Sequence, residues 1–391
     1  MAEKKLKPGW KVWRFDQIAT NVNVRIDNPS ESGMEHYVGL EHLDPDSLRI
    51  RRWGSPDDVE ATKLVFKKGD IIFGRRRAYQ RKLGVAEFDG ICSAHAMVLR
   101  AKPEVVLPEF LPFFMQSDLF MNRAVEISVG SLSPTINWKT MAVQEFALPD
   151  RNEQRRLVEL FKAFEEMTSA HEAALSAANC FYDSLREDVF GEDADRLHLN
   201  ELILDIQAGK SFVGIDEPPR TDDCKAVLKV SAVGKRAFLP QESKTLISQH
   251  EFLHEHAVRL GDVLISRANT PDLVGLACYV ERDYPNLMLS DKTLRLVPKQ
   301  GVPSPLLVEA LRTTASRQYL KANATGTGGA MKNISQAKLR AMPVRFPPKD
   351  AWPELESLLE SAIAAISRLS ERLEETRSLQ RRGLSELLGG E

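Results

Sequence analysis

One nine-residue pattern occurs twice in this chain and constrains its fold more than any other feature. A Gly-Asp pair, three apolar residues, a small residue and an arginine run from Lys67 to Arg75 and again from Arg259 to Arg267. Each copy is followed by an apolar run ending in proline, a loop rich in Gly, Ser and Thr, an apolar-proline step and a long charged segment. Such a repeat predicts two similar domains, each followed by a helix. It also suggests one task performed at two places on one partner.

Composition excludes several classes of protein. The 391 residues are enough for two or more domains, and the apolar and charged fractions are ordinary for a globular protein. No apolar stretch follows Met1, and no window approaches the roughly 18 apolar residues of a membrane helix. We therefore expect neither a signal peptide nor a membrane partner. The scattered cysteines indicate buried thiols in a reducing cytoplasm: Cys92, Cys180, Cys224 and Cys278.

The net charge of −2 bears on the kind of partner. A protein that binds nucleic acid by itself usually has an excess of lysine and arginine. The near-neutral balance argues against a stand-alone DNA-binding protein. It argues less against a subunit that shares DNA with basic partners.

Four consecutive segments are predicted, and together they make an α+β fold. Residues 1–150 and 192–348 each have the pattern of a mixed domain, with short apolar strands separated by turn residues. Apolar residues at three-to-four spacing predict one helix over residues 108–124 and its counterpart over residues 306–322. The two domains are expected to be related by a pseudo-two-fold repeat.

Residues 151–191 and 349–391 are predicted to form two long helices. Apolar residues on each alternate steps of three and four, as in a coiled-coil seam. The first seam comprises Leu157, Leu160, Phe164, Met167, His171, Ala174, Ala178, Phe181 and Leu185, and the second comprises Leu355, Leu359, Ala362, Ile366, Leu369, Leu373 and Thr376. Two such seams most simply bury each other in an antiparallel pair, and the alternative is that each binds another protein. His171 is expected to set the register rather than to bind a metal.

A dense basic segment directly follows the first Gly-Asp pattern. It contains Arg75, Arg76, Arg77, Tyr79, Gln80, Arg81 and Lys82. After a buried strand we expect an exposed loop, in which the basic side chains contact phosphates, Gln80 or an arginine reads a base edge and Tyr79 stacks or packs. A solvated charged loop is the alternative. The matching loop in the second half has different side chains on the same frame, among them Arg267, Asn269 and Thr270. Two readers of two sequences would differ in this way.

Two loops rich in small residues are also matched between the halves. They span residues 130–137 and 326–333, and the second ends in Lys332 and Asn333. Glycine lets backbone amides approach a phosphate closely, so both loops are candidates for nucleic-acid contact. Ordinary connecting loops are the alternative.

The residues indicate no enzyme site. Asp70 and Asp262 suit tight turns better than catalysis. The sequence contains no methyltransferase cofactor motif and no nuclease-like spacing of acids and lysine, and none of the predicted helices carries the H-x-x-x-H arrangement of a metal site. We therefore expect no catalytic residue, cofactor or metal in this chain.

Together these motifs resemble the specificity (S) subunits of type I restriction-modification systems over essentially the whole chain. Residues 68–75 and 261–267 are similar to the family's strand signature in each target-recognition domain. The run Leu148-Pro149-Asp150-Arg151-Asn152-Glu153-Gln154-Arg155-Arg156-Leu157 is similar to the step that opens its central helix. The second helix departs from this step, because Asp350-Ala351-Trp352-Pro353-Glu354 stands where Asn-Glu-Gln is expected.

The resemblance implies that each domain reads half of a bipartite double-stranded DNA target and that the helices fix the gap. It implies no chemistry in this chain. The chain would instead position two adenine methyltransferase (M) subunits, which carry S-adenosylmethionine, and recruit ATP-dependent restriction (R) subunits. Three rival interpretations are an enzyme with an unfamiliar motif, a protein-interaction scaffold, and the specificity subunit of another phage-defence system.

Overall fold

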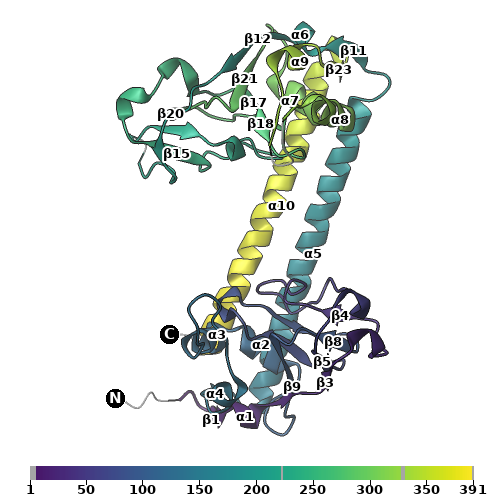
Figure 1. The fold of residues 1–391 in the computed structure, drawn as a ribbon, viewed down its shortest axis with the longest axis vertical. Helices are drawn as coiled ribbons and strands as arrows, with labels where there is room; N and C mark the ends of the chain where they lie inside the picture. The colour runs from purple at the N-terminus through teal and green to yellow at the C-terminus, as the bar shows by residue number, and fades with distance from the viewer. Residues whose placement is uncertain (1–5, 222, 327–330, 390–391) are drawn as a thin grey trace. The chain divides into compact units, whose positions relative to one another are not determined.

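The computed structural model describes residues 6–221, 223–326 and 331–389. The chain divides into two compact units, one made of residues 1–173 and 369–391 and the other of residues 174–368. Both divisions fall inside long helices, α5 (Arg151–Val189) and α10 (Trp352–Leu387), so each helix contributes a segment to both units. Each unit mixes helices and strands, as an α+β fold does (Figure 1).

The described part of the first unit contains two four-stranded sheets and a two-stranded one. The orders are β2-β9-β6-β7, β3-β5-β8-β4 and β1-β10, and neighbours are antiparallel except for β4 and β8. In chain order the elements are β1 (Lys11–Arg14), α1 (Phe15–Ile18), β2 (Ala19–Val22), β3 (Arg25–Ile26), β4 (Tyr37–Val38), β5 (Lys63–Phe66), β6 (Ile71–Gly74), β7 (Leu83–Val85), β8 (Gly90–Cys92), β9 (Ala96–Ala101), α2 (Phe110–Gln116), α3 (Asp118–Glu126), α4 (Trp138–Ala142) and β10 (Glu145–Leu148).

The second unit contains a four-stranded sheet whose order, β12-β21-β17-β19, follows the first unit's β2-β9-β6-β7 strand for strand along the chain. Helix α7 contacts β17 and β19 of this sheet (Figure 1). The elements are β11 (Asp195–His198), α6 (Leu199–Leu202), β12 (Ile203–Ala208), β13 (Gly214–Ile215), β14 (Ala226–Leu228), β15 (Ser243–Leu246), β16 (Ala257–Val258), β17 (Val263–Ser266), β18 (Ala268–Asn269), β19 (Ala277–Tyr279), β20 (Tyr284–Met288), β21 (Thr293–Pro298), α7 (Ser304–Arg312), α8 (Thr314–Asn323), β22 (Lys332–Asn333), α9 (Gln336–Arg340) and β23 (Pro343–Phe346).

The other large sheet of each unit shares three strands and differs at its edges. Strands β5, β8 and β4 of the first unit correspond in order and direction to β16, β20 and β14 of the second. The first unit adds β3 beside β5, whereas the second adds β15 and then β13 beside β14. The three-strand centre is therefore common to both units, and opposite edges carry the differences.

The prediction of one helix over residues 108–124 is wrong, and so is its counterpart over residues 306–322. The first is two helices, α2 and α3, which meet at Ser117, and the second is α7 and α8, which meet at Thr313. The hydroxyl of Ser117 donates to the carbonyl of Phe114 at 2.6 Å and accepts from the amide of Phe120 at 3.4 Å. A hydroxyl that caps the second helix in this way ends the first, although apolar periodicity continues across the break.

The seam predicted for α5 is partly wrong. Leu160, Met167 and Phe181 are 40%, 38% and 65% exposed, while Phe161 and Tyr182 are buried. The apolar core of the first unit covers the first turns of α5, where the rings of Phe113 and Phe161 lie 5.3 Å apart. The first turns of α5 therefore face the apolar core of the first unit. The buried face of α5 differs from the one that the apolar spacing alone predicts. On α10 the predicted seam is buried or half-buried throughout.

Within the first unit, the segments of α5 and α10 contact each other side by side. Nδ1 of His171 lies 3.1 Å from Oγ1 of Thr376, and the hydroxyl of Thr168 donates to Oε1 of Gln380 at 3.4 Å. His171, the later residue on α5, contacts the earlier residue on α10, and Thr168 contacts the later one. The two segments therefore run antiparallel. The position of His171 agrees with a polar residue that sets the register of the helix pair.

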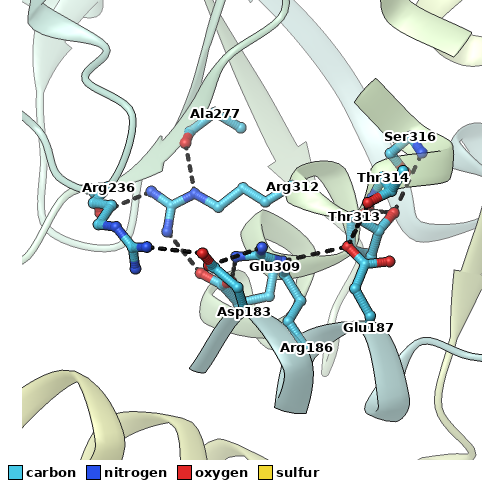
Figure 2. Close-up of polar contacts among 11 residues, drawn as sticks. Asp183, Arg186, Glu187, Arg236, Ala277, Glu309, Arg312, Thr313, Thr314 and Ser316 are labelled. Carbon is cyan, nitrogen blue, oxygen red and sulfur yellow. Dashed lines mark hydrogen bonds and ion pairs between the residues drawn. The ribbon is translucent and has the colours of Figure 1, made fainter. Parts of the chain in front are cut away.

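Within the second unit, an ionic network fastens the last turns of α5 to α7 (Figure 2). Glu309, whose side chain is 3% exposed, pairs with Arg312 at 2.6 Å and with Arg186 at 3.4 Å. Asp183 pairs with Arg186 and with Arg236, at 3.0 Å in each case. Burial, followed by the charge of Glu309, raises the pKa of the neighbouring Tyr182 hydroxyl. A buried carboxylate between two arginines is stable only while both partners remain.

Candidate nucleic-acid interface

Each repeated Gly-Asp pair forms a tight turn that starts a central strand. Gly69 has a φ of +89° and Gly261 has a φ of +86°, a conformation that glycine adopts without steric cost. The amide of Asp70 donates to the carbonyl of Lys67 at 2.9 Å, and the Asp70 carboxylate accepts from the Lys67 amide at 2.9 Å. The turn before Asp262 repeats both hydrogen bonds. The interpretation of these aspartates as turn residues is therefore confirmed.

An arginine on the neighbouring strand neutralises each of these carboxylates. Arg100 on β9 contacts Asp70 through Nε at 2.7 Å and through Nη2 at 2.8 Å. Arg295 on β21 contacts Asp262 at 2.7 Å. The two arginines do not occupy corresponding positions. Arg295 faces Leu264, so it lies two residues earlier in β21 than the position that corresponds to Arg100 in β9. Each turn is thus held by an ion pair as well as by backbone hydrogen bonds, and it fixes where the following strand begins.

The predicted basic loop begins where β6 ends, and it pairs with the loop of residues 130–137. The carbonyl of Arg75 accepts from the amide of Ile136 at 3.0 Å, and the amide of Arg77 donates to the carbonyl of Pro134 at 2.8 Å. Arg76 forms an isolated antiparallel bridge with Thr135. The two loops that the sequence analysis selected independently are therefore one continuous surface.

Two arginines of this surface converge on one serine. Nη2 of Arg76 and Nε of Arg77 each lie 3.2 Å from the hydroxyl oxygen of Ser133. Arg76 is also 3.5 Å from Nε2 of the exposed His95. Partial burial and the charges of Arg76 and Arg75 lower the pKa of His95. A strong local positive potential is what an anion such as a DNA phosphate requires.

The other predicted residues of the loop divide into two kinds. Tyr79 is 54% exposed and Gln80 is half-buried, on a short 3-10 turn. Arg81 is engaged by Asp46 at 2.6 Å and by Asp118 at 3.0 Å, and Lys82 donates to the carbonyl of Leu40 at 2.6 Å. Arg81 and Lys82 therefore stabilise the loop itself, as does the hydrogen bond of 3.1 Å from Arg75 to the carbonyl of Ala94. Arg81, with two carboxylate partners, is the poorest candidate for DNA contact among these cations.

The second unit uses the same backbone frame with other side chains. The carbonyl of Arg267 accepts from the amide of Ile334 at 2.9 Å, which corresponds to the bond between Arg75 and Ile136. Strand β18 pairs with β22, placing Asn269 opposite Lys332 and Ala268 opposite Asn333. Arg267, Thr270 and Asn333 are exposed, whereas Asn269 and Lys332 are half-buried. Residues 327–330 of the predicted loop lie outside the described residues.

This surface also contains His95, Leu132 and Ser133. His95 was not predicted from the sequence, and the loop of residues 130–137 was predicted for its backbone amides rather than for the side chains of Leu132 and Ser133. His95 follows β8, which is far along the chain from the loop of residues 130–137. A leucine in a run of glycine, serine and proline was the available signal, because such loops are normally polar.

Two other kinds of feature are absent from the described residues. Within the residues that the structure describes, no three His, Cys, Asp or Glu side chains gather as a metal site would require. Among the same residues, no helix is both long and apolar enough to cross a membrane. Burial raises the pKa of the Cys278 thiol to about 12 and also raises that of Cys92, so both thiols are protonated at neutral pH.

Comparison with known proteins relates this surface to a family. Residues 58–178 match the type I restriction modification DNA specificity domain. The match begins just before the first Gly-Asp turn and ends within α5, so it includes the paired loops. In Escherichia coli, the EcoEI specificity subunit is 30% identical over 183 residues, and the EcoDI specificity subunit is 27% identical over 194. Over this match the chain is similar to the specificity subunits of type I restriction-modification systems.

The extent of these likenesses differs. The EcoEI and EcoDI alignments each cover 46% of this chain, but they cover 31% and 41% of those relatives. The chain therefore spans less than half the length of these two relatives. The EcoKI specificity subunit of Escherichia coli K12 aligns over 93% of this chain and 84% of its own length, at 20% identity.

Solved structures of type I restriction-modification proteins share the fold. A chain from a structure that concerns complex assembly and conformational transition of the type I restriction-modification system aligns over the full length of both chains, with a TM-score of 0.62 and 21% identity. The S subunit from M. genitalium aligns over 99% of this chain and 98% of its own, with a TM-score of 0.56 and 11% identity. At these identities the likeness is one of fold.

Proposed function

We propose that this chain is the DNA sequence-specificity subunit of a type I restriction-modification complex and reads a bipartite target, one half-site with each unit. One observation carries the proposal. The paired loops of the two units have the same backbone hydrogen bonds, from Ile136 to Arg75 and from Ile334 to Arg267, but present different side chains. A constant frame with variable side chains is what two readers of different sequences need.

The units are proposed to be two similar target-recognition domains related by a pseudo-two-fold repeat, with one long helix after each. The corresponding strand orders of the main sheets and the repeated Gly-Asp turns support this. The domains would span residues 1–150 and 192–348, and the helices would span residues 151–191 and 349–391. The different edges of the second sheets support different targets for the two domains.

The helices are proposed to form an antiparallel coiled coil that fixes the gap between the half-sites. Support comes from the antiparallel contacts within the first unit and from the length of the helices, 39 residues in α5 and 36 in α10. At 1.5 Å per residue, each is a rod of roughly 55 Å.

The chain is proposed to be non-catalytic and to work through its partners. It would place two adenine methyltransferase subunits, which hold S-adenosylmethionine, on double-stranded DNA and would recruit restriction subunits, in the cytoplasm. The near-neutral charge of the chain agrees with partners that supply further phosphate contacts. A second candidate is the specificity or scaffold subunit of another phage-defence methyltransferase system.

Methylome sequencing of cells with and without this chain tests the proposal. We expect adenine methylation at one bipartite motif, and we expect it to disappear when the chain is deleted. Methylation that does not depend on the chain would contradict the proposal. Methyl transfer or cleavage by the purified chain alone would favour an enzyme, and an assembled complex without sequence preference would favour a scaffold.

The gap-setting role has its own test. Seven heptad-compatible residues are inserted after Ala170, with seven more at the facing position after Arg377. The insertion lengthens the rod by about 10 Å, or about three base pairs of DNA. We expect an altered gap and unchanged half-sites in the methylome. New half-site sequences at the old gap would contradict the role of the helices as a ruler.

A further inference from the structure

A short hairpin protrudes from the candidate interface of the first unit. The amide of Val129 donates to the carbonyl of Thr135 at 3.1 Å, and the amide of Thr135 donates to the carbonyl of Val129 at 3.0 Å. Gly130 has a φ of +121°, which allows the chain to reverse directly after the bridge. The stem is joined to Arg76 by a second bridge, so the hairpin stands on the same frame as the basic loop.

This hairpin exposes two apolar side chains, Leu132 at its tip and Val129 in its stem. Leu132 is 91% exposed and Val129 is 73% exposed. One exposed leucine on a protein surface needs no explanation by itself. This leucine, however, is adjacent in sequence to Ser133, on which the guanidinium groups of Arg76 and Arg77 converge at 3.2 Å. An apolar tip beside two arginines suits a partner that offers phosphates and apolar groups close together.

Duplex DNA offers this combination in its major groove. The groove is wide enough for a two-stranded ribbon, and the apolar group that it displays is the 5-methyl of thymine. Arginines that bind the backbone position a loop but carry no sequence information directly. A side chain at the tip, held between those arginines and the bases, can provide that information.

We propose that Leu132 makes a specificity-determining contact with the methyl group of a thymine in the half-site read by the first unit. The inference rests on the proposed function. Arg76 and Arg77 position the hairpin on phosphates, and Leu132 distinguishes a T·A pair from a C·G pair at one position. It follows that this half-site contains a thymine.

The second unit has a hairpin with the same stem, closed by two backbone hydrogen bonds of 2.8 Å between Thr325 and Asn333. Met331 on this hairpin is 48% exposed. Residues 327–330 lie outside the described residues, so the inference is made for the first unit alone.

The test combines protein variants with uracil substitution, because uracil differs from thymine only in lacking the methyl group. The full chain, assembled with its methyltransferase subunits, is titrated with duplexes that carry the target found by methylome sequencing. Each thymine of the target is replaced by uracil in turn. For the wild type we expect a loss of about fourfold in affinity at one position, the effect of removing one methyl group from an apolar contact.

The Leu132→Ala variant should bind thymine and uracil duplexes equally at that position, because the partner of the methyl group is gone. A side chain this exposed can be shortened without loss of folding. Leu379→Ala is the matched control, since Leu379 is a 47% exposed leucine on α10, and it should retain the wild-type discrimination. Arg77→Ala should weaken binding to all duplexes and retain the discrimination.

Two results would overturn the inference and leave the proposed function standing: target half-sites without thymine, or a uracil effect that is unchanged in Leu132→Ala. An assembled wild-type complex with no sequence preference would overturn both.

Discussion

The side-chain amide of Gln154 donates to the carbonyl of Pro149 at 2.9 Å, five residues earlier. In the second unit, the indole nitrogen of Trp352 donates to the carbonyl of Pro347 at 2.8 Å, over the same spacing of five residues. In both cases the proline follows the last strand of a unit and the donor lies in the first turns of a long helix. The sequences at the two helix starts differ, yet each supplies a donor to the corresponding proline carbonyl.

Gln154 is expected to stabilise the first unit more than Trp352 stabilises the second. Gln154 is 1% exposed and also accepts from the amide of Leu107 at 2.8 Å. Gln154→Ala leaves buried groups unsatisfied and should lower the free energy of unfolding by about 2–3 kcal/mol, whereas Trp352→Phe should lower it by about 1 kcal/mol. Denaturant titration measures both. The exposed Asn152→Ala serves as control, and equal losses in all three variants would contradict the argument.

Glu309 is expected to be the critical member of the network in Figure 2. Its side chain is 3% exposed, and those of Arg186 and Arg312 are 13% and 11% exposed. Glu309→Gln removes the carboxylate from Arg312 and leaves Arg186 to the more exposed Asp183, and it should cost about 3–5 kcal/mol. Asp183→Asn, at a position with 46% exposure, should cost less than about 1 kcal/mol. Thermal unfolding distinguishes the two, and a Glu309→Gln variant as stable as wild type would show that the network is not a clamp.

The basic loop is expected to separate into residues that bind DNA and residues that hold the loop. Each phosphate contact contributes about one unit to the slope of log affinity against log salt. Replacing Arg75, Arg76 and Arg77 with alanine should therefore weaken binding and reduce the slope by about two to three. Arg81→Ala should lower thermal stability, because it breaks the pairs with Asp46 and Asp118, and should leave the slope nearly unchanged. The opposite pattern would show that the first three arginines are merely solvated.

Glu165 is expected to destabilise the first unit at neutral pH. It lines a pocket of about 400 Å³, and burial raises the pKa of its carboxyl despite Arg49, Lys162 and Arg51 nearby. The folded state then holds this proton to a higher pH than the unfolded state, whose pKa is about 4.3. The stabilisation that protonated Glu165 gives the folded state is thus lost as the pH rises through the raised pKa.

Glu165→Gln removes this titration. The melting temperature of the variant should exceed that of wild type by about 1–3 °C at pH 7, and the difference should disappear near pH 4. Melting curves between these pH values provide the measurement. Parallel pH profiles for wild type and variant would mean that the carboxyl is not perturbed by folding.

Much of the fold was predictable because its signals are local. The Gly-Asp turns, the strands after them and the extents of α5 and α10 follow from hydrogen bonds and spacings within a few residues. The breaks at Ser117 and Thr313 were missed for a related reason: a single hydroxyl ended each helix while the apolar periodicity continued. The candidate loops were selected by the repeat, which is also a property of the chain alone.

The sequence by itself determined the two-part repeat, the turns and the position of the basic loop. Only the tertiary structure decided which distant residues hold the cations of that loop, because Asp46, Asp118 and Leu40 contact Arg81 and Lys82 across a large separation in sequence. It also decided which face of α5 is buried and that Gln154 and Trp352 donate to corresponding carbonyls, those of Pro149 and Pro347. Local patterns specify elements, whereas the partners of a side chain depend on packing between distant segments.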